Sequence, residues 1–443
     1  MKKERPDMEI YVHIPFCIKK CRYCDFLSFP SGNDSAGKED RYVEALLREI
    51  AEMRHGRGKC DAAPADVTSV FIGGGTPSVL PAESIRRILD RIREVYFVRE
   101  DAEITMEANP GTITEEKARI WKKAGVNRLS MGLQSAHDEE LRLLGRIHTW
   151  EDFLESWKTA RNAGFDNINI DLMSALPGQK EETWRDTLKR VIALAPEHIS
   201  AYSLIVEPGT PFYEDYGAMS SDIADYGEYA DVPEDHLARY RGRARIPGET
   251  EDRAMYHDTK RILAEAGYRR YEISNYAKAG RECRHNLGYW TGVEYLGFGL
   301  GASSCLCENG HYVRFSVTRD PDEYRGCFES RTRAAAERPS EPESSDHNAG
   351  DAGIRPRALY DTTEILSEAD RMAEFMFLGL RLTDGVSAAE FRKEFGREIR
   401  EVYGEVIGKL RREGLLAENG DRILLTETGL DVSNIAMAEF LPD

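Results

Sequence analysis

The chain has 443 residues, of which 41% are hydrophobic and 31% are charged, and its formal net charge is -18. This length allows two or three structural units around a large buried core. The acidic excess excludes a broad basic surface of the kind that binds nucleic acids, and no apolar run approaches the roughly 20 residues of a membrane span. The charged first five residues are not followed by an apolar segment. We therefore predict no signal peptide and expect a cytoplasmic protein with reduced thiols.

Three cysteines with the spacing C-x3-C-x2-C, namely Cys17, Cys21 and Cys24, follow the first predicted strand. Three thiolates this close in sequence suit one metal centre, either a zinc ion or an iron–sulfur cluster. A closed structural site needs four ligands, so this loop either takes a fourth ligand from elsewhere or leaves that position to a small molecule. A disulfide with a spare thiol fits poorly, because nothing indicates secretion. The remaining cysteines are expected to be ordinary thiols: Cys60, Cys283, Cys305, Cys307 and Cys327.

Strand-like and helix-like segments alternate from residue 8 to about residue 206. Short apolar segments predict strands at residues 9–16, 67–73, 103–108, 128–133, 167–172 and 198–206. Amphipathic segments predict helices at residues 40–53, 82–96, 114–123, 149–162 and 181–194. Ala-Gly before an apolar residue recurs at Gly125, Gly164 and Gly267, where a left-handed glycine closes a helix. Repeated strand–helix units predict an α/β fold with a parallel sheet and outer helices.

Polar residues stand where four of these strands end. The second strand runs into Gly73-Gly74-Gly75-Thr76, whose backbone can approach a ligand closely and offer N–H groups to a carboxylate. The following strands carry Glu107, Gln134 and Asp171 at or near their ends. Each residue alone also fits a turn, a helix cap or a buried hydrogen-bonded group. Together they favour one polar ligand lying across the carboxyl ends of the strands.

A second group of functional candidates lies in Cys283-Arg284-His285-Asn286-Leu287-Gly288-Tyr289-Trp290. A histidine with nearby aromatic residues is commonly a core cluster with satisfied hydrogen bonds. The same residue types also suit a porphyrin, because imidazole ligates heme iron and aromatic rings pack on the macrocycle. A glycine-rich turn at residues 297–302 follows, and Cys305 and Cys307 alternate around Leu306 as they would in a strand.

The remaining segments differ in character. An acidic segment at residues 207–250 is expected to cover the mouth of the sheet as loop and helix, before a helix at residues 252–266 and a strand at 268–276. Residues 329–358 contain almost no large apolar side chains and are expected to be disordered. Helices are predicted at residues 367–380, 388–394 and 399–413, before a hairpin of 415–418 with 422–425. Helices before such a wing resemble a winged-helix module, but the wing lacks the Lys/Arg stripe of a DNA reader.

The cysteine loop, the flanking His13-Ile14-Pro15-Phe16 and Cys24-Asp25-Phe26, and the H-N-x-x-Y-W motif together resemble one known family. The sequence is identified as a member of the radical S-adenosylmethionine superfamily. It resembles the oxygen-independent coproporphyrinogen III oxidases, and more closely their heme-chaperone (HemW) branch. The resemblance implies a partial (β/α)6 TIM-like barrel with a C-terminal winged-helix-like α+β domain. The implied domains are the barrel at 1–215, an extension or lid at 216–328, the insertion at 329–358 and the C-terminal domain at 359–443.

The resemblance also assigns ligands. It implies a 4Fe–4S cluster on Cys17, Cys21 and Cys24, whose open iron takes the amino and carboxylate groups of S-adenosylmethionine. Heme as cargo is implied for His285, Asn286, Tyr289 and Trp290. The residues implied for S-adenosylmethionine are Tyr11, Gly74, Gly75, Thr76, Glu107, Gln134, Arg146 and Asp171.

Within the family, two departures favour the chaperone branch over the oxidase. The oxidase has a fourth cysteine two positions beyond the third, where this chain has Phe26, and it has an N-terminal arm where only sixteen residues precede Cys17. The chaperone branch implies delivery of heme to apo-hemoproteins, such as respiratory enzymes at the membrane, with dimerisation as one role left to the cluster and S-adenosylmethionine. The other two hypotheses are oxidative decarboxylation of a porphyrinogen and a zinc-binding winged-helix regulator.

Overall fold

The computed structural model describes residues 5–31, 35–53, 65–217, 244–308, 310–336 and 359–442. Its centre is a run of six parallel strands that neighbour one another in chain order. They are β1 (Asp7–Ile14), β4 (Asp66–Gly74), β5 (Phe97–Ala108), β6 (Arg128–Gln134), β7 (Ile168–Ser174) and β8 (His198–Ser203). The six predicted strands are confirmed, with shifted ends and with β5 beginning six residues earlier than predicted.

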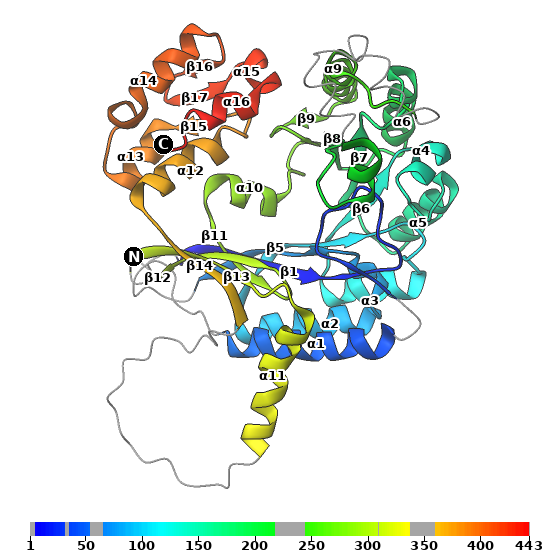
Figure 1. The fold of residues 1–443 in the computed structure, drawn as a ribbon. Coiled ribbons are helices and arrows are strands. Elements are labelled where there is room, and N and C mark those ends of the chain that lie inside the picture. The colour runs from blue at the N-terminus through cyan, green and yellow to red at the C-terminus, as the bar shows by residue number, and fades with distance from the viewer. Residues whose placement is uncertain are drawn as a thin grey trace, which may run out of the picture.

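Helices connect these strands and cover one face of the sheet. The predicted five are confirmed as α1 (Ser35–Glu52), α2 (Ala82–Val95), α3 (Glu115–Ala124), α5 (Trp150–Asn162) and α6 (Glu181–Ala193). Two short elements, η1 (Pro77–Val79) and α4 (Asp138–Leu143), lie between them. Gly125, Gly164 and Gly267 all have positive φ, at 101°, 89° and 84°, which confirms the predicted left-handed helix ends. Figure 1 shows α1, α2 and α3 on one side of the sheet, and α10 (Arg284–Thr291) on the other.

Each central strand alternates between two environments. Ile10 and Val70 pair across β1 and β4 and are buried in the apolar core beneath the helices. Glu9, Ser69 and Glu103 pair in the same way across β1, β4 and β5, but on the opposite face. Because side chains alternate with a period of two, the face that looks toward α10 is polar. We call the space on this face the lumen.

The sheet extends beyond the six strands at both edges. Beside β1 lies the parallel strand β11 (Glu294–Phe298), then the antiparallel β12 (Ser303–Glu308), β13 (His311–Val317) and β14 (Tyr360–Leu366). Beside β8 lie β10 (Asn275–Ala277) and β9 (Arg269–Arg270), both antiparallel to their neighbours. The single strand predicted at residues 268–276 is therefore wrong. The chain turns between β9 and β10 because the Glu272 carboxylate accepts hydrogen bonds from Ser274 N and Asn275 Nδ2, both at 2.7 Å.

Two short strands and two further helices complete the larger part of the chain. Phe16–Cys17 (β2) pairs with Phe29–Pro30 (β3) and closes the cysteine loop. The helix predicted at 252–266 is α9 (Glu249–Glu265), and α11 (Pro321–Ala336) follows β13. The predicted disordered insertion at 329–358 thus begins within a helix, and its residues 337–358 lie outside the described residues. Residues 218–243 of the expected lid also lie outside them.

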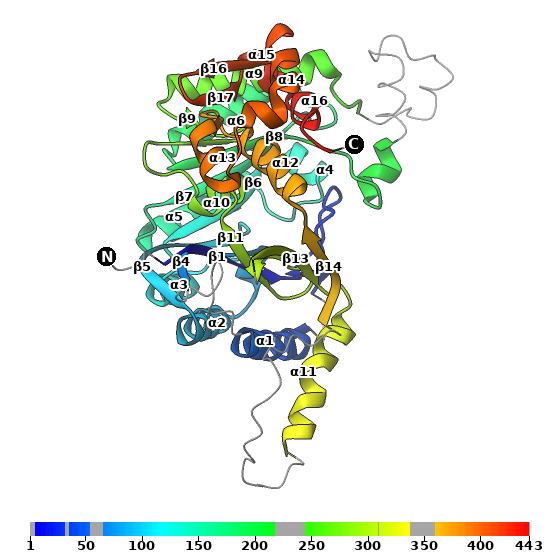
Figure 2. The ribbon, with the colours of Figure 1, turned by 90° about the vertical axis from the view of Figure 1, so that its left-hand side faces the viewer.

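The C-terminal domain has its own apolar core, built around side chains such as Phe391 and Ile407. The predicted helices and hairpin are confirmed as α12 (Glu368–Gly379), α13 (Ala388–Phe395), α14 (Ile399–Arg412), β16 (Leu416–Asn419) and β17 (Arg422–Leu425). A third strand, β15 (Val386–Ser387), and the helices α15 (Glu427–Asp431) and α16 (Ser433–Ala438) complete it. Figure 2 shows this domain stacked above the sheet, with α11 extending on the far side. No helix in the described part of the chain has the length and apolarity to cross a bilayer.

Candidate functional site

The three loop cysteines lie just beyond the carboxyl end of β1 and are not disulfide-bonded. Cys17 is buried, whereas Cys21 and Cys24 are partly exposed. Thr76 donates its hydroxyl to Cys17 Sγ at 3.4 Å, and Arg146 Nη1 donates to Cys21 Sγ at 3.5 Å. Donors aimed at sulfur stabilise thiolate character, which every metal centre bound by cysteine needs.

The spacing of the loop thiols, rather than their electrostatics, fits a multi-metal cluster. Burial raises the pKa of Cys17, and it raises the pKa of Cys24 to about 11, with neighbouring thiols adding to both shifts. In the described residues, no three His, Cys, Asp or Glu side chains gather tightly enough to hold a single ion. Around one zinc, sulfurs at 2.3 Å from the metal would lie within about 4 Å of one another. In a cluster each cysteine binds its own iron, so three free thiols spread along one loop suit that arrangement better.

The glycine element after β4 packs against the chain itself. Gly74 has φ 110°, and a Cβ there would collide with the His13 ring, while a Cβ at Gly75 would meet the backbone of residues 14 and 16. Gly74 N donates to Glu107 Oε2 at 3.0 Å, and Gly75 N donates to the Ile14 carbonyl at 2.8 Å. The glycines therefore allow the end of β4 to lie against β1 and β2. The N–H groups predicted to meet a ligand carboxylate are already engaged by the protein.

The polar strand ends do converge at one edge of the lumen. Asp171 accepts from Ser130 Oγ at 3.0 Å and from Asn169 Nδ2 at 2.7 Å, and burial raises its pKa. Burial and the nearby Asp171 raise the pKa of Glu107 to about 8. Gln134 adopts φ 75°, a left-handed conformation rare outside glycine.

Asn109 and Tyr202, which were not assigned to a ligand from the sequence, bond to the predicted residues Arg146 and Gln134 at this edge. Arg146 donates to Asn109 Oδ1 at 2.8 Å and to the Gly132 carbonyl, and it lines a small hollow together with Cys21, Thr76 and Asn109. Tyr202 donates to Gln134 Oε1 at 3.3 Å. Asn109 directly follows a predicted strand end, so its position was a usable signal, whereas nothing marked Tyr202. Tyr11 lies deeper in the lumen, where its hydroxyl is 3.1 Å from His13 Nδ1.

The H-N-x-x-Y-W motif forms α10, which docks on the polar face of the sheet. Glu103 accepts hydrogen bonds from the backbone N–H groups of Arg284 at 3.2 Å and His285 at 3.4 Å, so a carboxylate caps the start of this helix. A Cβ at Gly288 would collide with the Glu9 carboxyl, so glycine permits the close approach of α10 to β1. Glu9 in β1 and Glu103 in β5 therefore set the distance of α10 from the sheet and its rotation about the helix axis.

His285 is buried in the lumen, with 2% of its surface exposed. Its Nδ1 lies 2.7 Å from Ser69 Oγ and 3.6 Å from Glu9 Oε2, and its ring stacks on Phe71 at 5.1 Å. Burial and the Arg128 cation lower the pKa of His285 to about 3, so the imidazole is neutral. Its Nε2 has no hydrogen-bond partner among the described residues.

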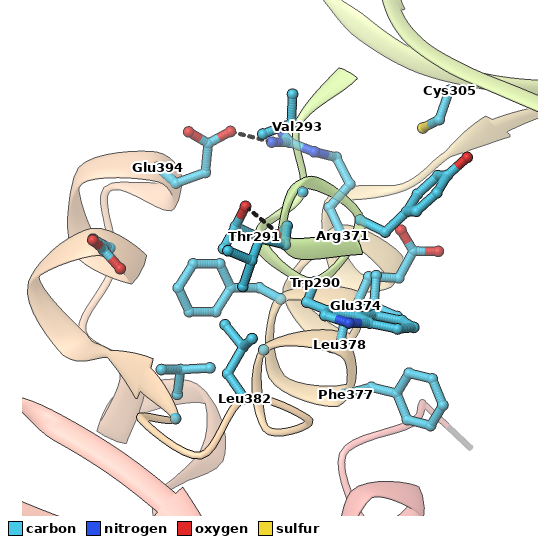
Figure 3. Close-up of a pocket in the computed structure, with 18 of the residues that line it drawn as sticks. Trp290, Thr291, Val293, Cys305, Arg371, Glu374, Phe377, Leu378, Leu382 and Glu394 are labelled. Carbon is cyan, nitrogen blue, oxygen red and sulfur yellow. Dashed lines mark hydrogen bonds and ion pairs between the residues drawn. The ribbon is translucent and has the colours of Figure 1, made fainter. Parts of the chain in front are cut away.

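The other end of the motif faces a cavity of about 910 Å³ between the large sheet and the C-terminal domain, which we call the seam cavity. Tyr289 and Trp290 line this cavity, whereas His285 and Asn286 do not. Trp290 lies under the Arg381 guanidinium, 4.3 Å from its ring centre. Figure 3 shows Trp290 beside Glu374 and Leu378 of α12, and Cys305 and Arg371 also belong to the residues that line the cavity. The motif is thus divided between two environments.

Comparison with known proteins gives consistent matches along the chain. Residues 11–191 match the Radical SAM superfamily model, and residues 366–432 match the HemN C-terminal domain model. The chain is 34% identical over 432 residues to "Heme chaperone HemW" of Bacillus subtilis, covering 97% of this chain and 98% of that protein. It is 35% identical over 328 residues to the protein of that name from Escherichia coli, covering 74% and 77% of the two chains.

A solved structure has the same fold. Coproporphyrinogen III oxidase (HemN) of Escherichia coli, a radical SAM enzyme, superposes with a TM-score of 0.74 at 22% identity, covering 99% of this chain and 90% of that chain. At this identity the match shows the fold alone.

Proposed function

This chain belongs to the heme chaperone HemW family of the radical S-adenosylmethionine superfamily, and from that premise we propose that it binds heme and delivers it to apo-hemoproteins. The observation that carries the proposal is the wall that Tyr289 and Trp290 form in the seam cavity. The volume of this cavity, about 910 Å³, falls within the range of about 300–1,000 Å³ for small-molecule and cofactor sites. Aromatic side chains supply the flat apolar surface that a macrocycle needs.

The residues around the cysteine loop fit the cluster and S-adenosylmethionine that the superfamily implies. Cys17, Cys21 and Cys24 would hold the cluster, with Arg146 and Thr76 donating to two of the sulfurs. Such a cluster, when bound, supplies an electron to S-adenosylmethionine. The polar edge formed by Glu107, Gln134, Arg146 and Asp171 would bind the amino-acid and ribosyl groups of that cofactor. Gly74, Gly75 and Thr76, whose backbone N–H groups bond within the protein, would shape this edge, and Tyr11 would contribute from deeper in the lumen.

Phe26 stands where the oxidase has its fourth cysteine, and its side chain is 69% exposed. A phenyl ring cannot ligate iron or donate a proton, so this position contributes nothing to redox chemistry here. We therefore place heme binding before porphyrinogen decarboxylation as the function of this chain.

The test begins with anaerobically reconstituted protein titrated with ferric heme and followed by the Soret band. We expect saturable binding, and faster transfer to an apo-globin from the loaded protein than from free heme. Trp290→Ala should weaken binding, while Trp150→Ala, on the outer helix α5, should not. Absence of saturable binding by the wild type would overturn the proposal, and multiple turnovers of coproporphyrinogen III with reductant and S-adenosylmethionine would favour the oxidase instead.

A further inference from the structure

The seam cavity is built by two domains. Its near wall comes from α10 and from β11 to β13, and its far wall comes from α12, α13 and β15. The far wall combines apolar side chains, including Phe375, Leu378 and Phe395, with charged ones such as Arg371 and Glu374. Together with Tyr289 and Trp290 they enclose a space with aromatic residues on both sides, which suits a flat hydrophobic ring system.

One soft ligand faces this space. Cys305 lies in β12, level with Tyr295 of β11 and Arg314 of β13, and all three residues line the cavity. Burial raises the pKa of the Cys305 thiol to about 11, while the Arg314 cation acts in the opposite direction. The residues that line the cavity include neither histidine nor methionine, so within the described chain Cys305 is the strongest iron-binding donor there.

Two cations at the cavity form no ion pair within the described residues. Arg314 pairs with Glu374 at 2.7 Å, and Arg371 pairs with Glu394. By contrast, Lys393 and Arg422 make no ion pair with any described residue, and Arg422 donates only to the Gly385 carbonyl at 3.2 Å. Both belong to the C-terminal domain, so a ligand whose carboxylates lie at one edge would find its counter-charges on that side.

From these contacts we propose that the heme ring lies in the seam cavity, with the Cys305 sulfur as an axial ligand to iron and with Lys393 and Arg422 beside the propionates. This inference rests on the proposed function and adds the location and the ligand. The Fe–S bond forms as the thiol loses its proton to solvent, and no electron is transferred. His285 is not the iron ligand here. It is a positioning residue, which fixes α10 through Ser69 and Phe71 and so orients Tyr289 and Trp290.

The experiment compares ferric heme with metal-free protoporphyrin IX as probes of the anaerobically prepared full chain. Leu378→Trp places a large ring in the cavity from its far wall. It should weaken the binding of both probes by at least about tenfold. Its control, Ile435→Trp, places the same ring on an exposed part of α16, where Ile435 is 64% exposed, and should change neither. Cys305→Ser should weaken heme binding by a similar factor and leave the binding of protoporphyrin IX unchanged. It should also abolish the red-shifted Soret band that the ferrous–CO complex shows when a thiolate ligates the iron. The control Cys307→Ser, two residues along β12 and outside the lining, should retain that band.

A labelling measurement on the wild type guards against variants that fail to fold. Heme should protect Cys305 from alkylation, as mapped by mass spectrometry, and should leave the labelling of Cys327 unchanged. If the wild type binds no heme, the proposed function itself fails. If the wild type binds heme but Leu378→Trp and Cys305→Ser bind it equally well, and the axial signal disappears only in His285→Ala, the seam site is wrong and the chaperone function stands.

Discussion

Replacing Glu9 by glutamine tests the charge state of the buried pair beneath α10. Glu9 is 2% exposed, and burial raises the pKa of its carboxyl from the ordinary value of 4.5 to about 9. Its neighbour His285, 3.6 Å away, has its pKa lowered by burial to about 3. Both groups are therefore uncharged at neutral pH, and the contact between them is not an ionic attraction.

The sign and size of the effect follow from proton linkage. A carboxyl with a raised pKa keeps its proton in the folded chain at pH values where the unfolded chain has lost it. Its contribution to stability is complete below pH 4.5 and is lost as the pH rises toward 9, at about 1.4 kcal/mol per pH unit. Glutamine does not titrate, so between pH 5 and pH 8 the wild type should lose about 4 kcal/mol of unfolding free energy relative to Glu9→Gln.

Urea unfolding at pH 5, 6, 7 and 8 measures this difference, with Glu116→Gln on the exposed face of α3 as the control that should show no pH-dependent gain. A constant difference across this range would refute the neutral pair. Lower stability of Glu9→Gln at pH 8 would show instead that an ionised Glu9 pairs with a protonated His285.

Three further predictions follow from local contacts. Cys21→Ala should remove most of the cluster iron from anaerobically reconstituted protein, measured by iron analysis, while Cys327→Ala should retain it. Gly288→Ala should lower the unfolding free energy by about 1–3 kcal/mol, because its Cβ would collide with a buried carboxyl. Gly326→Ala, where a Cβ meets nothing within 4 Å, should be neutral or stabilising in the same urea assay. Ser387→Ala should destabilise the C-terminal domain by about 1 kcal/mol in thermal unfolding, since Ser387 Oγ caps α13 by accepting from Glu390 N, and an unchanged midpoint would contradict that role.

Local signals were sufficient to predict the barrel strands, their connecting helices and the hairpin near the C-terminus. Period-two and period-3.6 patterns, glycine helix ends and a tight turn each lie within a few residues of chain, and all of these elements form where they were expected. The edge strands β11 to β14 were not predicted as a group. The pairing of β11 with β1 joins residues almost 290 positions apart, such as Tyr11 with Gly297, and no local pattern encodes such a contact. By contrast, β12 and β13 pair as neighbours in the chain, as in the contact of Cys307 with Tyr312.

The candidate site shows a similar limit. Residue types and spacing identified the cysteine loop and the polar strand ends, and the structure brings Glu107, Gln134, Arg146 and Asp171 to one edge. The direction that each motif residue faces could not be predicted. It depends on the rotation of α10, which is set by Glu103 at its start and by the contact of Gly288 with Glu9.

With heme in the proposed seam site, the shared walls of the cavity would make cargo retention and interdomain closure two aspects of one equilibrium. A molecule that contacts both domains raises the free energy needed to separate them. By thermodynamic linkage, any partner that separates the domains lowers the affinity of the protein for that molecule. A recipient protein that pulled α12 away from α10 would therefore lower the affinity for cargo without entering the cavity, and unloading would be driven from the outer surface of the carrier.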